Sequence, residues 1–317
     1  MTLQSADSTS RFEPLIEQAR ALRNDHLPII GVVHPCDQAS LQSAIEIEAA
    51  GFARPVLIGH PGLIKDAADR ACIESETLEI ISAGKAPGAA AKRAAELACN
   101  GHVHALMKGA LHSDDLLSAV VSRHSGLRLG RRISHVFLFD VPKYPKLLAI
   151  SDCVVNIAPD LSAKRDILSN AVDCLRKIGI SRPRTAVIAA VETPNPKIPA
   201  TMDALNLASL AASGEWSDAV VEGPFGLDNA ISAHSAKLKG IESRVAGEAD
   251  LLLVPDVNAG NMLYKSLVYF AGAECAGLVI GARVPVVLAS RADTVRTRLC
   301  SAAFAAAYLG FERMVAA

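Results

Sequence analysis

Residues 284–293 read VPVVLASRAD, and a helical pattern follows over residues 295–309. The first six residues are apolar and rich in valine, as expected of a strand buried on both faces of a parallel sheet. The polar residues Ser290, Arg291 and Asp293 therefore fall between a strand and a helix. The N-terminus of a helix offers unbonded backbone N–H groups and the positive end of the helix dipole. The stretch predicts a strand–helix unit that can hold an anion where the strand ends.

The same residues also have a purely structural interpretation. A serine followed three residues later by an aspartate is close to a capping box, in which side chains bond the free N–H groups of a helix start. Ser290 would then only cap the helix, and Arg291 would only be solvated. The two interpretations are compatible, because a capped helix still presents N–H groups to a ligand.

The rest of the chain repeats the alternation of apolar strands and amphipathic helices. Strands are expected at residues 29–33, 55–59, 79–81, 104–107, 134–139, 147–150, 154–157, 185–191, 219–224, 251–255 and 284–289. Helices are expected at residues 12–25, 40–50, 61–71, 87–99, 112–122, 164–178, 202–213, 260–271 and 295–309. This alternation is typical of α/β proteins with a parallel sheet and right-handed crossovers.

Composition agrees with this fold class and excludes several functions. Half of the 317 residues are hydrophobic while only 4% are aromatic, which suits an α/β core of aliphatic side chains. The net charge of −1 carries no basic bias, so nucleic acid is not expected as a partner. The longest uncharged apolar stretch near an end, residues 299–311, is shorter than the ~20 residues of a membrane span.

Cysteine usage and the first residues favour a cytoplasmic protein. The seven cysteines are scattered and never form a CxxC pair, so reduced thiols are favoured over a disulfide framework or a structural zinc site. Residues 1–13 are polar and contain no apolar core of a signal peptide.

Several familiar catalytic motifs are absent from the sequence. There is no GxGxxG for a dinucleotide, no GxxxxGK[ST] for a nucleoside triphosphate, and neither GxSxG nor HExxH. His102 and His104 are more typical of a strand end than of a metal site, and no metal is expected.

Polar residues instead gather at the ends of four expected strands. They lie in the loops around residues 108–115, 222–230, 255–265 and 290–293. Ligands of open α/β sheets bind at the carboxyl ends of the strands. We therefore expect the four loops to share one cleft.

These loops resemble those of one enzyme family. Residues 254–265, VPDVNAGNMLYK, resemble the signature of the phosphate acetyl/butyryltransferases. The order of Lys108-Gly109 with His112, the Asp228-Asn229 loop, the signature and Ser290-Arg291 is similar to the butyryltransferase-like branch, from about residue 28 to the end. The resemblance implies the reversible reaction of an acyl-CoA with inorganic phosphate to give acyl phosphate and coenzyme A, the acyl group being acetyl, propionyl or butyryl.

The resemblance also implies an architecture. The family has two parallel-sheet α/β domains with the active site in a cleft between them, similar to the isocitrate and isopropylmalate dehydrogenases. Here the first domain would comprise residues 1–142 with 291–317, and the second residues 143–290. A homodimer or larger homo-oligomer is implied, and no cofactor is required.

Roles for individual residues follow from the resemblance and from the charges. Ser290, Arg291 and Asp293 are the expected catalytic residues, with Arg291 stabilising the developing negative charge and Asp293 as a candidate base. The expected substrate-binding residues are Lys108, Gly109, His112, Arg132, Asn229, Asn261 and Lys265. For Lys265 and Asn261 a solvated or capping role is about as well supported, and Asp256 and Asp228 are expected to be structural.

Two departures from the family keep other functions open. Thr297 stands where the acetyltransferase branch has an aspartate, and Ser118 where family members often have an arginine. One alternative is therefore a non-catalytic protein that binds acyl-CoA or phosphate on the same scaffold. The other is a metal-dependent decarboxylating dehydrogenase of similar fold, although its cluster of aspartates and its nucleotide loop are not found.

Overall fold

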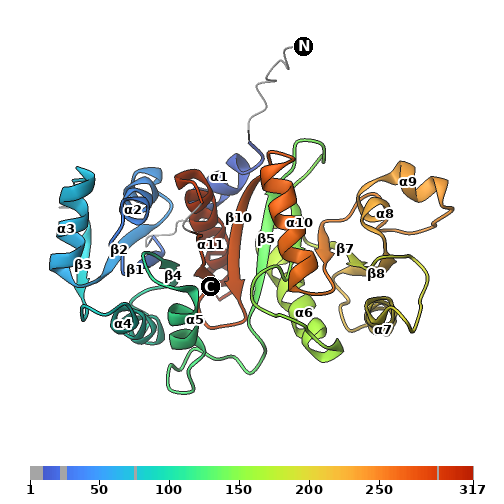
Figure 1. Ribbon diagram of the computed structural model, residues 1–317, viewed down its shortest axis with the longest axis horizontal. Coiled ribbons are helices and arrows are strands. Elements are labelled where there is room, and N and C mark those ends of the chain that lie inside the picture. Colours follow the sequence, from blue (N-terminus) through green and yellow to red (C-terminus); the bar gives the residue numbers. More distant parts are fainter. Residues whose placement is uncertain (1–9, 22–26, 75–76, 291–292, 317) are drawn as a thin grey trace, which may run out of the picture.

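The computed structural model describes residues 10–21, 27–74, 77–290 and 293–316, with side chains as far as residue 310. The molecule is elongated, and helices cover both faces of a sheet (Figure 1). The strands are β1 (Ile29–Val33), β2 (Arg54–Gly59), β3 (Glu79–Ser82), β4 (Ala105–Lys108), β5 (Ser134–Asp140), β6 (Leu148–Ser151), β7 (Arg184–Ile188), β8 (Val220–Phe225), β9 (Leu251–Leu253), β10 (Glu274–Ile280) and β11 (Val286–Val287). The helices are α1 (Glu13–Ala21), α2 (Gln38–Ala50), α3 (Pro61–Ala71), α4 (Pro87–Cys99), α5 (Ser113–Val121), α6 (Leu161–Lys177), α7 (Pro199–Ala212), α8 (Leu227–Ile231), α9 (Ala233–Leu238), α10 (Val257–Tyr269) and α11 (Val295–Ala316).

The described strands form one eleven-stranded mixed sheet in the order β3-β2-β1-β4-β11-β10-β5-β6-β9-β7-β8. Strands β3, β2, β1, β4 and β11 are parallel to one another, and so are β6, β9, β7 and β8. Between these groups, β10 is antiparallel to β11 and to β5, and β5 is antiparallel to β6. The two parallel groups therefore run in opposite directions.

The α/β class is confirmed, but the expectation of two separate parallel sheets is wrong because β10 joins the two groups. The apolar pattern predicts no strand over residues 274–280, because Gly277 interrupts the apolar run. Close packing requires this glycine. A β-carbon there would lie 2.7 Å from the Phe137 ring and 2.8 Å from the His135 ring.

A second local difference concerns residues 154–157, which form a turn rather than the expected strand. The carboxylate of Asp152 accepts hydrogen bonds from the backbone N–H groups of Val154, Val155 and Asn156 at 2.9, 3.0 and 3.2 Å. A side chain that bonds the backbone in this way competes with pairing in a sheet. The apolar pattern alone did not reveal this competition.

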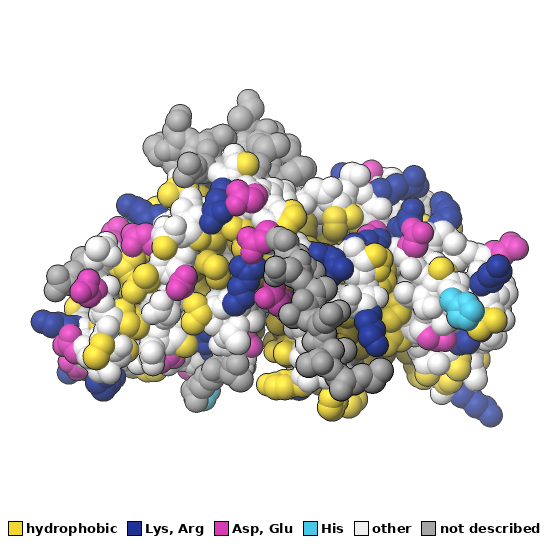
Figure 2. Space-filling view, turned by 90° about the horizontal axis from the view of Figure 1, so that it is seen from above, with side chains coloured by type: hydrophobic (Ala, Val, Ile, Leu, Met, Phe, Trp, Pro, Cys, Tyr) yellow, Lys and Arg dark blue, Asp and Glu magenta, His cyan; other side chains and the backbone are white. Residues whose placement is uncertain are grey.

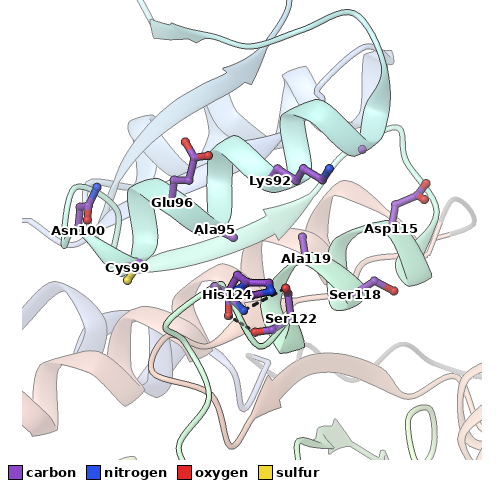
Figure 3. Close-up of a pocket in the computed structure, with 12 residues that line it drawn as sticks. Lys92, Ala95, Glu96, Cys99, Asn100, Asp115, Ser118, Ala119, Ser122 and His124 are labelled. Carbon is purple, nitrogen blue, oxygen red and sulfur yellow. Dashed lines mark hydrogen bonds between the residues drawn. The ribbon is translucent and has the colours of Figure 1, made fainter.

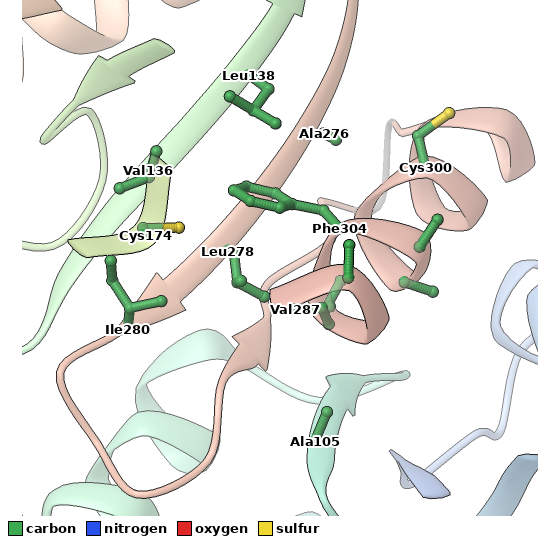
Figure 4. Close-up of a cluster of buried hydrophobic side chains, with 14 of the residues drawn as sticks. Ala105, Val136, Leu138, Cys174, Ala276, Leu278, Ile280, Val287, Cys300 and Phe304 are labelled. Carbon is green, nitrogen blue, oxygen red and sulfur yellow. The ribbon is translucent and has the colours of Figure 1, made fainter. Parts of the chain in front are cut away.

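Both faces of the sheet are buried, as expected for strands between two layers of helices. One apolar cluster lies under α1, α2, α3, α6, α7 and α11, and two others lie under α4 with α5 and under α10. Phe304 of α11 points toward Val136, Leu138 and Leu278 on the two central antiparallel strands (Figure 4). The last helix is thereby fixed over the centre of the sheet, which positions the residues just before it.

The surface carries charges of both signs. On the face seen in Figure 2, basic and acidic side chains are interspersed and no continuous basic stripe is visible. Among the described residues, no helix combines the length and the apolar character that crossing a membrane would require.

Candidate active site

The carboxyl ends of β1, β4 and β11 lie side by side at one edge of the sheet. Lys108 ends β4 and pairs with Val33 of β1. Met107 pairs with Val287 of β11, and Ser290 follows three residues later. Two of the residues predicted from sequence, Lys108 and Ser290, therefore follow neighbouring strands at the same edge.

Ser290 and Asp293 form a turn that precedes α11. The backbone N–H of Ser290 donates to Oδ2 of Asp293 at 2.7 Å, and the N–H of Asp293 donates to the Ser290 carbonyl at 3.2 Å. The cap of α11 is Thr294, whose Oγ1 accepts from the N–H of Thr297 at 3.1 Å. The structure thus adds Thr294 as a cap that the sequence analysis missed. Arg291 lies outside the described residues.

The Asp293 carboxylate lies among three basic side chains. Burial raises its pKa above the ordinary value, while the hydrogen bond from Ser290 and the charges of Arg298, Lys108 and Lys265 lower it. Burial is the largest of these effects, so the pKa remains raised. Burial therefore makes this carboxylate a better proton acceptor than an exposed one, while the neighbouring cations favour its charged form.

Lys108 is 4% exposed, which is unusual for a lysine. Its Nζ donates to the carbonyl groups of Leu111 at 3.2 Å and of Gly109 at 3.4 Å. These bonds shape the loop that leads to His112, an exposed residue at the N-terminus of α5. Three of the predicted residues, Lys108, Gly109 and His112, therefore belong to one loop beside the Ser290 turn.

Helix α10 brings Lys265 to the same edge from the other half of the chain. The helix begins at the cap residue Asp256, whose carboxylate accepts from the N–H groups of Asn258 and Ala259 at 2.9 and 3.0 Å. This bonding confirms the structural role expected for Asp256. The helix then runs back along the sheet, where Tyr264 stacks on Phe137 with ring centroids 4.4 Å apart. The next residue, Lys265, is exposed, and its charge lowers the pKa of Asp293.

Asn261 lies one turn before Lys265 on α10. Its Nδ2 donates to the carbonyl oxygen of Cys153 at 3.4 Å, and the side chain is half-buried. Gly260 lets the helix approach this segment, because a β-carbon there would lie 2.9 Å from the carbonyl oxygen of Asp152. In this arrangement Asn261 ties α10 to the turn after β6.

Two predicted substrate-binding residues lie elsewhere. Arg132 precedes β5, which runs in the same direction as β4, so Arg132 lies at the opposite edge of the sheet from Lys108. Asn229 is fully buried after β8, six strands away from β11, where its Nδ2 donates to Glu192. The expectation that all four polar loops share one cleft is therefore wrong, since β8 and β9 run opposite to β4 and β11.

The structure also brings in a residue that the sequence analysis missed. Arg298, in the first turn of α11, is 2% exposed, and its Nη2 donates to the carbonyl oxygen of Ser290 at 2.8 Å. No motif marks this arginine, because a basic residue eight positions after Ser290 resembles an ordinary exposed helix position.

A cavity of about 740 Å³ lies between α4 and α5. The cavity is lined by Lys92, Glu96 and Cys99 of α4, by Ser118 of α5 and by Ser122, which follows α5 directly (Figure 3). The α5 end of the cavity lies within two helical turns of His112. Its volume is within the range of ~300–1,000 Å³ typical of small-molecule sites.

The arrangement at the Ser290 edge can bind an anion and accept a proton. Lys108, Lys265 and Arg298 supply positive charge, Ser290 supplies an exposed hydroxyl, and Asp293 supplies a carboxylate. Among the described residues, no three histidine, cysteine or acidic side chains are grouped so that they could hold a metal ion.

Comparison with known proteins agrees with this chemistry. The family model described as "Phosphate acetyl/butaryl transferase" matches residues 88–306. A phosphate acetyltransferase of Rhizobium meliloti is 46% identical over 305 residues, which cover 96% of this chain and 95% of the relative. A probable phosphate butyryltransferase of Bacillus subtilis is 40% identical over 296 residues, covering 93% and 97%.

A solved structure has a similar fold. A branched-chain phosphotransacylase from Enterococcus faecalis V583 aligns with a TM-score of 0.79 at 27% identity, covering 89% of this chain and 99% of that one. The match to the family model and the identity along nearly the whole chain show that this protein belongs to the phosphate acetyl/butyryl transferase family of acyltransferases.

Proposed function

We propose that this protein catalyses the reversible transfer of a short acyl group between coenzyme A and inorganic phosphate, by direct attack in a ternary complex. The single observation that carries the site assignment is the Asp293 carboxylate, bonded to Ser290 and lying within range of the charges of Lys108, Lys265 and Arg298. Membership of the family supports the same reaction.

In the direction of acyl-CoA synthesis, the sulfur of coenzyme A attacks the carbonyl carbon of the acyl phosphate. The carbon–sulfur bond forms, the bond between the carbonyl carbon and the phosphate oxygen breaks, and inorganic phosphate leaves. Asp293 takes the thiol proton, a contribution of ~10²–10⁴ for a well-placed base. Thr297 cannot take this proton, because a threonine hydroxyl is not a base at neutral pH. Asp293 is therefore the proposed base.

The developing negative charge lies on the acyl oxygen and the phosphate. Lys108 and Lys265 are the cations assigned to the phosphate, with Ser290 as a hydrogen-bond donor to it. Arg291 is proposed to stabilise the same negative charge, because it follows Ser290 in the sequence. Loss of one preorganised donor typically costs ~10²–10³ in turnover, whereas loss of an exposed charge such as that of Lys265 costs less.

The cavity between α4 and α5 is proposed to hold the nucleotide end of coenzyme A. The helix α5 begins five residues after Lys108, so a long substrate can extend from the Ser290 edge along this helix. Lys92 and His124 supply basic groups in the lining, although Glu96 and Asp115 limit its positive charge.

We further propose that the reaction uses no metal and no redox cofactor. Acyl transfer between sulfur and oxygen changes no oxidation state, which supports the absence of a redox cofactor. Seven free cysteines support a reducing, cytoplasmic location. We also propose that the protein forms a homodimer or a larger homo-oligomer. Its two domains would comprise residues 1–142 with 291–317 and residues 143–290, and its fold would be similar to that of the isocitrate and isopropylmalate dehydrogenases.

The acyl group is proposed to be acetyl or another short chain, since relatives with acetyltransferase and butyryltransferase names align along the chain. One methylene changes selectivity by only ~1–3 kcal/mol in an apolar pocket. The preference must therefore be measured with a series of acyl groups.

The test is phosphate-dependent thiol release from acetyl-, propionyl- and butyryl-CoA by the wild-type protein and by Arg291→Ala. We expect release that requires phosphate and falls at least a hundredfold in the variant. Arg283→Ala is the matched control, because Arg283 is exposed and bonds the Gly126 carbonyl at 3.3 Å, away from Asp293. Folded wild-type protein that releases no thiol from any of the three would contradict the proposal.

A further inference from the structure

Arg298 carries a buried guanidinium group. The proposed reaction assigns no catalytic step to it. It is 2% exposed, and its Nη2 donates to the carbonyl oxygen of Ser290 at 2.8 Å. Its Nε and Nη1 atoms are also buried, yet no group in the described part of the chain accepts a hydrogen bond from either. Most buried polar atoms in proteins are bonded, so two unbonded donors on one cation require an explanation.

Folding does not explain an arginine at this position. A buried charge is unfavourable unless it is paired and fully hydrogen-bonded. Arg298 also lies in the first turn of α11, where the positive end of the helix dipole disfavours a cation. An apolar side chain of similar length would fill the same space without either penalty. The reason for the charge must therefore lie in what it acts on.

The groups that Arg298 acts on are the two ends of the Ser290 turn. It holds the Ser290 carbonyl directly, while the N–H of the same residue is bonded to Asp293. In the described part of the chain, the charged groups whose charges act on Asp293 are Arg298 from α11, Lys108 from β4 and Lys265 from α10.

Two further titratable groups face Asp293, but both are neutral at pH 7. Burial raises the pKa of Cys275 on β10 to about 12 and raises that of Tyr264 on α10 still further. Lys265 is exposed. Lys108 is buried but bonds the carbonyl groups of its own loop, whereas Arg298 is buried and bonds the turn itself.

We propose that Arg298 is a positioning residue of the acyl-transfer site, which fixes the Ser290 carbonyl and supplies a buried positive charge that favours the ionised form of the Asp293 carboxylate. This inference rests on the proposed function, in which Asp293 is the base. It adds Arg298 to the residues proposed for the reaction, as one that acts through Ser290 and Asp293 rather than on the substrate.

The test compares the pH dependence of kcat/KM for acyl-CoA synthesis from acetyl phosphate and coenzyme A in Arg298→Gln and Arg298→Lys. Glutamine keeps a donor for Ser290 but has no charge, and lysine keeps the charge. With glutamine, the pKa of Asp293 should rise, so the acid limb of the profile should move to higher pH and kcat should fall at least tenfold. With lysine, the limb should remain at its wild-type pH.

Arg296→Met is the matched control. Arg296 is on the same helix, but it pairs with Glu13 and Glu274 and is not among the groups that act on Asp293. Its replacement should lower the unfolding temperature while leaving the acid limb in place. If Arg298→Gln does not fold, Arg298→Met provides the same uncharged comparison, because it fills the buried space with apolar atoms.

The outcomes separate this inference from the proposed function. Inactive wild-type protein contradicts the function itself. Active wild-type protein together with a folded, uncharged Arg298 variant that keeps the wild-type acid limb overturns the inference alone. Adding Arg298→Gln to Asp293→Asn should cost little further activity, because the base on which Arg298 acts is already absent.

Discussion

The backbone N–H of Ser290 and the carboxylate of Asp293 are joined by a hydrogen bond of 2.7 Å, directly after the strand that ends beside Lys108. This bond makes the turn before α11 a preformed structure and points one carboxylate into a cluster of cations. The group that closes this turn and a catalytic base can therefore be the same side chain, and the two roles can be separated by substitution.

Asp293→Asn should separate the two roles. The amide oxygen can still accept the hydrogen bond from Ser290, so the free energy of unfolding should change by less than ~1 kcal/mol. The proton acceptor is lost, so kcat for acyl-CoA synthesis should fall by ~10²–10⁴. Steady-state kinetics and urea unfolding measure the two effects. A stable variant with near-wild-type kcat would show that Asp293 only closes the turn.

Gly109→Ala should disturb the edge on which the site is built. The added β-carbon would lie 2.6 Å from the carbonyl oxygen of Val33 and 2.7 Å from that of His34, and these backbone atoms cannot rotate away. We expect a loss of about 1–3 kcal/mol in the free energy of unfolding, as for other overpacked sites, together with reduced activity.

Gly88→Ala is the control for this substitution. Gly88 lies in α4, where a new β-carbon meets no atom within 4 Å, and alanine favours helix over glycine. This variant should be as stable as the wild type or more so. Equal stability of both variants would show that the Gly109 loop can relax.

Lys265→Met and Arg132→Met should differ, although the sequence analysis proposed both residues for substrate binding. Lys265 acts on Asp293, whereas Arg132 lies at the opposite edge of the sheet. Loss of the exposed Lys265 charge should lower kcat/KM for phosphate about fivefold, the effect of ~1 kcal/mol. Arg132→Met should leave kcat/KM unchanged. Equal losses in the two variants would contradict this arrangement.

Ser118→Trp should test the cavity between α4 and α5. The indole would occupy space in the cavity of about 740 Å³, so KM for acyl-CoA should rise while KM for phosphate stays the same. Lys65→Trp, at an exposed position of α3, controls for the effect of an added surface tryptophan. An unchanged KM for acyl-CoA in Ser118→Trp would exclude the cavity from coenzyme A binding.

His135 should make the fold sensitive to acid. The side chain is 1% exposed, and burial lowers its pKa to about 4, an effect that the Asp152 carboxylate partly opposes. Below the ordinary pKa of ~6.5 the unfolded chain binds a proton at His135 that the folded protein does not. The free energy of unfolding should therefore be highest above pH 6.5 and should decrease as the pH falls toward 4. Between pH 7 and pH 5 the loss should be about 2 kcal/mol. Urea unfolding of His135→Phe should show a smaller loss over this interval, and an equal loss would contradict the assignment.

Much of the fold follows from local patterns in the sequence. Strands such as β1 and helices such as α4 are found where hydrophobic periodicity and flanking glycine or proline predict them. The same patterns placed Lys108 and Ser290 at strand ends, because a polar loop after an apolar run is a local feature. Family membership likewise depended on a contiguous segment, residues 254–265, and was confirmed by comparison.

What the sequence by itself determined is therefore the α/β class, most of the elements, the family and the Ser290–Asp293 turn. Only the tertiary structure decided the strand directions, which place Lys108 and Ser290 together and send Arg132 and Asn229 elsewhere. It also decided that Arg298 is buried against Ser290. Strand direction and the burial of a charge depend on partners distant in the chain, and the spacing of neighbouring residues carries no record of them.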